Sequence, residues 1–178
     1  MGKERIPVTP AIRVLRAAKV PYTEYIYKYV EHGGTTASSR ELKVDEHCMV
    51  KTLVMEDENK KPLIVLMHGD RQVSTKELAR QIGAKTVSPC LPETAEKHTG
   101  YKVGGTSPFG TRKTLPVYME ATVAEAPKVF INGGRRGYLV ELNPYDLIRL
   151  LKPTVVTVGI TTPVKQKRRE EGSQGDID

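Results

Sequence analysis

Two apolar segments separated by a short polar loop constrain the fold most strongly. Residues 47–55 and 62–68 are rich in aliphatic and β-branched side chains, whereas residues 56–61 between them are charged or polar. This pattern is typical of two buried strands joined by a hairpin. We therefore expect the two segments to pair in antiparallel fashion within a sheet.

Further helices and strands are expected on both sides of this hairpin. Capping residues ahead of apolar stripes predict helices over residues 10–18, 35–42, 76–82, 91–97 and 145–151. Alternating or β-branched patterns predict strands over residues 22–30, 85–88, 115–119, 128–134, 135–142 and 153–158. Residues 1–160 are expected to form one domain. Residues 161–178 lack apolar periodicity, and we expect them to form a charged, disordered tail.

Composition bears on location and partners. No apolar run approaches the roughly 20 residues of a membrane span, and the first residues do not resemble a secretory signal, so a cytoplasmic protein is expected. The formal net charge of +7 and the pI near 9.4 favour a polyanionic partner such as nucleic acid. Part of this charge lies at residues 165–169, in the expected tail, where basic residues are usually just solvated.

Glycine, hydroxyl, proline and basic residues are concentrated in residues 98–116. The Gly104-Gly105 pair allows a ligand to approach the main chain, and Thr106 and Ser107 add hydroxyls and amides. The segment matches neither the phosphate-binding P-loop nor the dinucleotide fingerprint. Two interpretations remain open at this point: a binding loop, or a connection whose glycines serve only backbone geometry.

Lys51 interrupts the first apolar segment. An interior ammonium costs several kcal/mol unless it meets an anion or hydrogen-bond acceptors, although a lysine on an edge strand can also extend to solvent. Cys48 and Cys90 have neither disulfide nor zinc-site spacing. We find no Ser/His/Asp order, metal-ligand cluster or placed carboxylate pair, so neither a metal nor a cofactor is expected.

Three motifs, in the same order along the chain, carry a resemblance. They are Val-Lys-Thr-Leu-Val at 50–54, the Gly-rich motif at 99–110, and Asn-Gly-Gly-Arg-Arg-Gly at 132–137. Together they resemble the YbaK family of aminoacyl-tRNA deacylases, and in particular its Cys-tRNA(Pro) deacylase branch, which is related to the editing domain of prolyl-tRNA synthetase. The similarity runs from Thr9 to about residue 158. It implies an α+β fold in which a mixed, mostly antiparallel sheet closes toward a barrel with surrounding helices.

The resemblance also implies an activity. Members of this family hydrolyse the ester that joins a wrongly attached amino acid to the terminal ribose of a tRNA. In the resembling branch, the cysteinyl thiolate of Cys-tRNA(Pro) attacks its own ester carbonyl, and Cys-tRNA(Cys) is a further possible substrate. The protein then needs only to hold and polarise the ester. Implied partners are mischarged tRNA(Pro) and prolyl-tRNA synthetase.

The resemblance implies site residues as well. The implied catalytic residues are Lys51, Gly105, Thr106 and Ser107. The implied substrate-binding residues are Tyr27, Tyr29, Thr52, Gly104, Pro108, Gly110, Asn132, Gly133, Gly134 and Arg136. The implied tRNA contacts are Arg112, Lys113 and Arg135.

Two positions depart from the pattern and leave alternatives open. Some family members carry serine and aspartate where this chain has Asn132 and Leu139. The amino acid removed could therefore be another small one such as alanine, with water or a ribose hydroxyl as nucleophile. A second hypothesis is a non-catalytic module that binds tRNA or a synthetase. A generic small-molecule hydrolase would lack a nucleophile.

Overall fold

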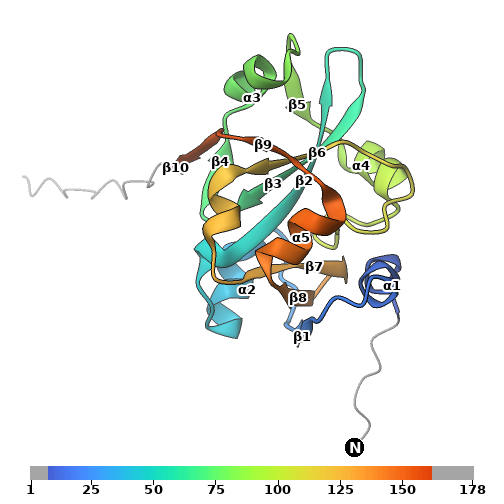
Figure 1. The fold of residues 1–178 in the computed structure, drawn as a ribbon, viewed down its shortest axis with the longest axis vertical. Coiled ribbons are helices and arrows are strands. Elements are labelled where there is room, and N and C mark those ends of the chain that lie inside the picture. Colours follow the sequence, from blue (N-terminus) through green and yellow to red (C-terminus); the bar gives the residue numbers. More distant parts are fainter. Residues whose placement is uncertain (1–7, 162–178) are drawn as a thin grey trace, which may run out of the picture.

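A computed structural model describes residues 8–161, and residues 1–7 and 162–178 lie outside this description. Five α-helices occur in it: α1 (Pro10–Ala17), α2 (Gly34–Leu42), α3 (Thr75–Ile82), α4 (Pro92–Thr99) and α5 (Pro144–Leu151). Two short 3-10 helices, η1 (Glu46–Cys48) and η2 (Ala121–Glu125), accompany them. Figure 1 shows these helices arranged around a central sheet.

The strands form one large mixed sheet and a small second one. The large sheet has the order β1-β8-β7-β2-β3-β6-β9, with β5 pairing to β2, while β4 pairs with β10. The strands are β1 (Thr23–Ile26), β2 (Met49–Asp57), β3 (Pro62–His68), β4 (Arg71–Val73), β5 (Val87–Pro89), β6 (Val117–Glu120), β7 (Val129–Arg135), β8 (Tyr138–Leu142), β9 (Thr154–Val156) and β10 (Gly159–Thr161).

This arrangement confirms the expected α+β class with a mixed, mostly antiparallel sheet. The β2–β3 hairpin is antiparallel as predicted, and the pairs β2–β7, β3–β6 and β6–β9 are parallel. Within the described residues the strand order is open at β1 and β9, so the sheet does not close into a complete barrel. The tail expected to begin at Thr161 begins later, because Thr161 is the last residue of β10. Residues 162–178 of the expected tail lie outside the described residues.

The capping signals expected at α1, α3 and α5 are realised in the structure, whereas α2 begins after Gly33 without a side-chain cap. The Thr9 side chain accepts from the Ile12 amide at the start of α1, and Ser74 does the same for Glu77 in α3. Gly83 ends α3 in the left-handed conformation with φ of 76°. The Asn143 side chain accepts from the amide of Tyr145 in α5. These caps satisfy helix-end amides, so the helix boundaries follow from short-range chemistry.

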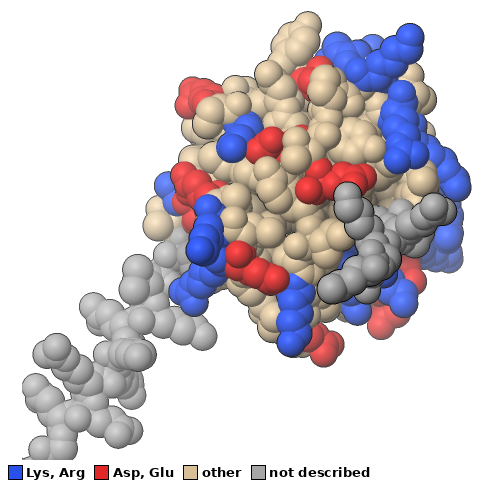
Figure 2. Space-filling view, turned by 90° about the horizontal axis from the view of Figure 1, so that it is seen from below, with Lys and Arg blue, Asp and Glu red and all other residues tan. Residues whose placement is uncertain are grey.

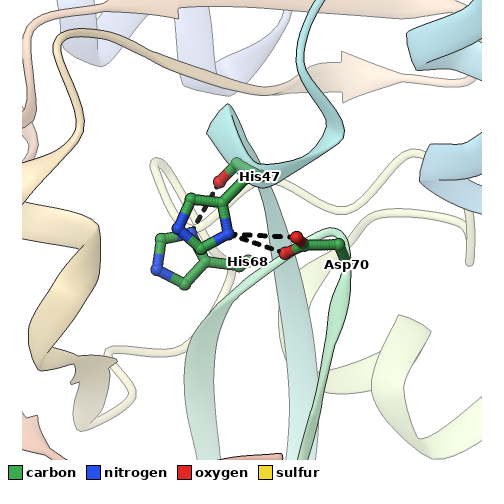
Figure 3. A group of neighbouring side chains, drawn as sticks. All are labelled: His47, His68 and Asp70. Carbon is green, nitrogen blue, oxygen red and sulfur yellow. Dashed lines mark hydrogen bonds and ion pairs between the residues drawn. The ribbon is translucent and has the colours of Figure 1, made fainter. Parts of the chain in front are cut away.

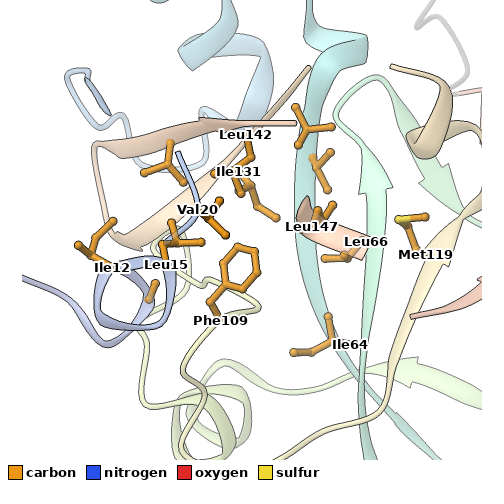
Figure 4. Packing of buried hydrophobic residues seen from close by; sticks show 14 of the residues in the cluster. Ile12, Leu15, Val20, Ile64, Leu66, Phe109, Met119, Ile131, Leu142 and Leu147 are labelled. Carbon is orange, nitrogen blue, oxygen red and sulfur yellow. The ribbon is translucent and has the colours of Figure 1, made fainter. Parts of the chain in front are cut away.

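Apolar side chains cover both faces of the β2–β3 hairpin. Ile64 and Leu66 belong to the main core with α1, α5 and the Gly-rich segment, whereas Val65 and Met67 pack against α3. Figure 4 shows Phe109 of the Gly-rich segment among the side chains of α1 and the sheet. Because strand side chains alternate between faces, both strands read as nearly continuous apolar runs. The Gly-rich segment is thereby anchored in the core.

Two strand predictions need correction. The strand predicted over 22–30 is limited to β1, because its pairing with β8 ends at Ile26. The turn between β7 and β8 lies at Arg136–Gly137 and not at residues 132–134, and Gly137 has a φ of 77°. Residues 132–135 instead form a bulge, in which the Asn132 side chain accepts from the amides of Gly134 and Arg135. The two glycines therefore bend the strand.

Candidate active site

The Gly-rich segment and the β7–β8 hairpin meet through side chains that bind main-chain carbonyls. Asn132 Nδ2 donates to the Gly104 carbonyl at 3.0 Å, and Arg136 Nε donates to the Val103 carbonyl at 2.8 Å. A Cβ atom on Gly105 would lie 2.7 Å from the backbone nitrogen of Arg136. We call residues 103–107 together with 132–136 the loop–hairpin junction. Only glycine allows the two backbones to approach this closely.

Tyr29 adds a third side to the junction. The Arg136 guanidinium lies 4.9 Å from the centre of the Tyr29 ring, which is cation–π geometry. Gly104 has a φ of 88°, and a Cβ atom there would lie 2.7 Å from the Tyr29 hydroxyl. Tyr27 packs instead beside the cluster of Met49, Phe130 and Leu139, where burial raises the pKa of its phenol. Of the two tyrosines, Tyr29 is the one that contacts the junction.

The hydroxyls and amides of the loop divide into occupied and available groups. The Gly105 amide and the Thr106 hydroxyl both donate to the Lys102 carbonyl, at 2.8 and 3.3 Å. Ser107 is fully buried, and its hydroxyl accepts from the Phe109 amide at 3.1 Å. Within residues 8–161, the backbone amides of Thr106 and Ser107 have no protein acceptor. Because Thr106 is half-buried and Ser107 is fully buried, the Thr106 amide is the one that can reach a ligand oxygen.

The N-terminus of α1 supports the junction from behind. The Thr9 hydroxyl donates to the Gly133 carbonyl at 2.5 Å, and a Cβ atom on Gly133 would lie 2.6 Å from the Tyr138 ring. Gly134 has a φ of 97° and leaves room for Tyr101. At the other end of the loop, Pro108 is buried, and Gly110, with a φ of 66°, lies against the backbone of Pro10. These residues shape the loop from inside the protein.

Lys51 follows directly on the pairing of β2 with β7. This parallel pairing ends at Val50 and Ile131, and Lys51 and Asn132 are the next residues of the two strands. The Lys51 ammonium donates to the Arg71 carbonyl at 2.5 Å. Burial lowers the pKa of Lys51, while the charges of Glu46 and Asp70 oppose this shift. Lys51 is therefore a half-buried cation with a defined acceptor.

The remaining expected site residues lie at the edges of this region. The hydroxyl oxygen of Thr52 is buried and has no hydrogen-bond partner in the described part of the chain. The backbone amides of Arg112 and Lys113 donate to the carbonyls of Thr99 and His98, which ties this segment to the end of α4. The side chains of both basic residues are exposed. Arg135 is also exposed. In Figure 2, Lys and Arg gather along one edge of the face shown, an arrangement that suits a phosphate backbone.

A second polar cluster was missed by the sequence reasoning (Figure 3). His47 Nδ1 lies 2.8 and 3.1 Å from the two carboxylate oxygens of Asp70, and the rings of His47 and His68 stack at 3.8 Å. These residues and Thr122 form what we call the histidine cluster, beside a pocket of about 530 Å³ lined in part by His47, His68 and Thr122. The signal was present: the β2–β3 hairpin brings η1, which immediately precedes β2, close to the last residue of β3.

The histidine cluster has metal-ligating residue types but not a metal-ligating arrangement. The two imidazole planes are only 9° apart, so their in-plane lone pairs cannot converge on one ion. Both nitrogens of His68 are also engaged, by the His47 carbonyl at 2.6 Å and the Thr122 hydroxyl at 2.7 Å. Burial lowers the pKa of His68, which favours its neutral form. The cluster is a hydrogen-bonded structural unit.

The sequence matches a protein class that edits aminoacyl-tRNA. The family model described as the aminoacyl-tRNA editing domain matches residues 32–150, a span that includes Lys51, the Gly-rich segment and the β7–β8 hairpin. The chain belongs to this family, which confirms the family resemblance carried by the three motifs and the enzyme class that it implied.

Individual relatives agree with this assignment. The chain is 30% identical over 143 residues to a protein of Enterococcus faecalis named "Putative Cys-tRNA(Pro)/Cys-tRNA(Cys) deacylase EbsC", covering 80% of this chain and 87% of that protein. It is 21% identical to a proline–tRNA ligase of Brachyspira hyodysenteriae over 48% of this chain and 15% of that enzyme.

A solved structure shares the fold. It is described as a "putative trans-editing enzyme for prolyl tRNA synthetase", and it matches with a TM-score of 0.73 and 21% identity over 88% of this chain and 99% of that one. In the described residues no helix has the length and apolar character needed to cross a membrane.

Proposed function

We propose that the chain removes wrongly attached amino acids from tRNA in trans, with Cys-tRNA(Pro) as the principal substrate and Cys-tRNA(Cys) as a second one. The observation that carries the proposal is the loop–hairpin junction. Its Gly104 and Val103 carbonyls are bound by Asn132 and Arg136, while the amide of half-buried Thr106 has no protein acceptor within residues 8–161. A backbone amide free to donate, on a loop tied to the hairpin, suits an oxyanion that develops on an ester carbonyl.

The proposed reaction uses the substrate's own nucleophile. The cysteinyl thiolate attacks the ester carbonyl and forms a carbon–sulfur bond, which places a negative charge on the carbonyl oxygen. The carbon–oxygen bond then breaks, and the ribose oxygen takes up the proton that the thiol had lost. The Thr106 amide stabilises the negative oxygen, and the Lys51 cation polarises the ester or holds the tRNA terminus. Exposed Arg112, Lys113 and Arg135 bind tRNA phosphates. This route explains how the chain works without a Ser/His/Asp set.

The name of the E. faecalis relative supports the choice of cysteine. A physical argument supports the need for editing: a synthetase pocket shaped for proline cannot strongly reject an amino acid of similar size. We further propose that tRNA(Pro) is the usual carrier, that prolyl-tRNA synthetase is a partner, and that the protein acts in the cytoplasm.

One observation favours a second substrate. Leu139 pairs with Asn132 across the hairpin and is buried with Met49 and Phe130, so this position beside the junction carries no charge. Without a charge at this position, the methyl group of alanine is accommodated as well as cysteine is. Ala-tRNA(Pro) is therefore the alternative substrate, and its hydrolysis would require water or the terminal ribose hydroxyl as nucleophile.

The test is a deacylation assay with Cys-tRNA(Pro), Cys-tRNA(Cys) and Ala-tRNA(Pro). Replacing the cation in Lys51→Ala should lower turnover at least about tenfold without unfolding the protein, and exposed Lys61→Ala serves as the matched control. Ser-tRNA(Pro) should be nearly inert if the thiol is the nucleophile. If all esters survive at the spontaneous rate, the chain is the non-catalytic binding module instead.

A further inference from the structure

A turn of the backbone holds the cation of Lys51. Its ammonium donates to the carbonyl of Arg71, the first residue of β4, which follows a two-residue turn after β3. An ammonium has three protons, so this bond fixes its position and leaves two donors for a substrate. Whatever fixes the turn at residues 69–71 therefore also fixes Lys51.

Asp70 and His47 fix this turn. The Asp70 carboxylate accepts from His47 Nδ1 at 2.8 and 3.1 Å and from Arg71 Nη1 at 3.1 Å. Burial alone would raise the pKa of Asp70, but the hydrogen bond and charge of His47 and the charge of Arg71 outweigh it, and the pKa lies below its usual value. An ionised carboxylate only accepts, so Nδ1 of His47 carries the proton.

His47 is in turn held by the sheet. Its ring stacks on that of His68, and its carbonyl accepts from Nδ1 of His68 at 2.6 Å. The turn is also closed on the other side, because the Gly69 amide donates to the Met49 carbonyl at 2.7 Å. A Cβ atom on Gly69 would lie 2.7 Å from the Glu46 carbonyl, so there is no room for the turn to shift toward η1.

We infer that His47 and Asp70 are positioning residues for Lys51 in the deacylation reaction, an inference that rests on the proposed function. The contacts form a chain: the His47 imidazole holds the Asp70 carboxylate, Asp70 holds the turn, and the Arg71 carbonyl holds the Lys51 ammonium. Neither residue touches the ester. Two members of the histidine cluster thereby act on the chemistry through the position of Lys51.

Two substitutions at one position separate this role from packing. His47→Asn keeps an N–H donor close to the place of Nδ1 but loses the ring, whereas His47→Phe keeps a ring to stack on His68 but loses the donor. We expect His47→Phe to lower kcat for Cys-tRNA(Pro) by about fivefold to tenfold with KM unchanged, because a misplaced charge affects the transition state most. His47→Asn should restore most of the loss.

The second readout does not depend on activity. The rate at which trinitrobenzenesulfonate labels Lys51, followed by mass spectrometry of its peptide, reports how firmly the ammonium is held. We expect severalfold faster labelling in His47→Phe and in Asp70→Asn, which loses the carboxylate charge, and the wild-type rate in His47→Asn, with urea midpoints confirming that all variants are folded.

Equal labelling of Lys51 in wild type and His47→Phe would overturn the inference. So would a kcat that stays at the wild-type value in His47→Phe, which keeps the ring, and falls in His47→Asn, which keeps the donor. If wild type hydrolyses no ester, the proposed function fails. The labelling rates then show whether His47 holds Lys51 at all.

Discussion

The loop–hairpin junction and the histidine cluster both gather polar groups, but they use them differently. In the cluster, the groups satisfy one another: both nitrogens of His68 and both carboxylate oxygens of Asp70 have protein partners. In the junction, Asn132 and Arg136 occupy carbonyls of the loop, and the amides of Thr106 and Ser107 remain without protein acceptors within the described residues.

This difference separates a structural polar cluster from a site that can bind a ligand. A self-satisfied cluster stabilises the fold and has little left to offer a ligand. A loop whose carbonyls are bound by side chains and whose half-buried Thr106 amide is free to donate is suited to an anion or a developing oxyanion. Substitutions in the junction should therefore affect activity, and substitutions that remove an outer hydrogen bond of the cluster should affect stability.

The largest effect is expected at Gly105. Gly105→Ala places a Cβ atom 2.7 Å from the Arg136 backbone nitrogen, where neither backbone can yield, so the junction must open. We expect kcat/KM for Cys-tRNA(Pro) to fall about a hundredfold. Gly83→Ala, which strains the end of α3 without any neighbour within 4 Å, is the control for a general loss of stability. A wild-type kcat/KM in Gly105→Ala would show that the close approach is unimportant.

A smaller effect is expected at Asn132. Asn132→Ala removes the bond to the Gly104 carbonyl and the acceptor for two amides in the bulge. We expect about a tenfold loss of kcat/KM, because the loop is no longer tied to the hairpin. Asn132→Asp keeps the acceptor and should recover part of the activity. If Asp and Ala behave alike in the same assay, the bond to Gly104 is the contact that matters.

In the histidine cluster, Thr122→Val tests stability without chemistry. The substitution removes the hydroxyl that bonds Nε2 of His68 at 2.7 Å but keeps the side-chain volume. The free energy of unfolding in urea should fall by about 1 kcal/mol, the usual net contribution of one hydrogen bond. Deacylation at saturating substrate should stay at the wild-type rate. A drop in turnover with no change in the urea midpoint would show that this part of the histidine cluster serves activity and not stability.

The smallest effect concerns pH. Burial lowers the pKa of His68 in the folded protein, so the unfolded chain takes up the proton more readily. This contribution to stability is present above the ordinary histidine pKa of about 6.5 and is lost as the pH falls below it. His68→Gln should therefore weaken the decline in urea midpoint between pH 7.5 and pH 5.5. Parallel declines in the two proteins would assign the effect to other groups.

Local signals allowed much of the fold to be predicted. The β2–β3 hairpin and the caps of α1, α3 and α5 depend on residues close in sequence, and all four predictions are confirmed. The bulge at residues 132–135 was read as a turn, because an Asn-Gly-Gly sequence gives no sign of the side-chain bonds that keep it inside a strand.

The site was harder to predict than the fold. The motifs pointed to the Gly-rich segment and to Lys51, yet no spacing rule reveals that Asn132 holds Gly104 or that Arg71 holds Lys51. The stacked His47 and His68 belong to η1 and β3, and their contact exists only once the β2–β3 register is set. The roles of the individual site residues remain predictions for the assays above.

Thr9 links the order of synthesis to the completion of the site. Its side chain starts α1 near the beginning of the chain and also binds the carbonyl of Gly133, 124 residues later. A ribosome releases the helix long before β7 emerges, and contacts across such separations form late in folding. The hairpin half of the proposed site therefore gains this support only after β7 has emerged, so a growing chain that has not yet exposed β7 should not edit tRNA.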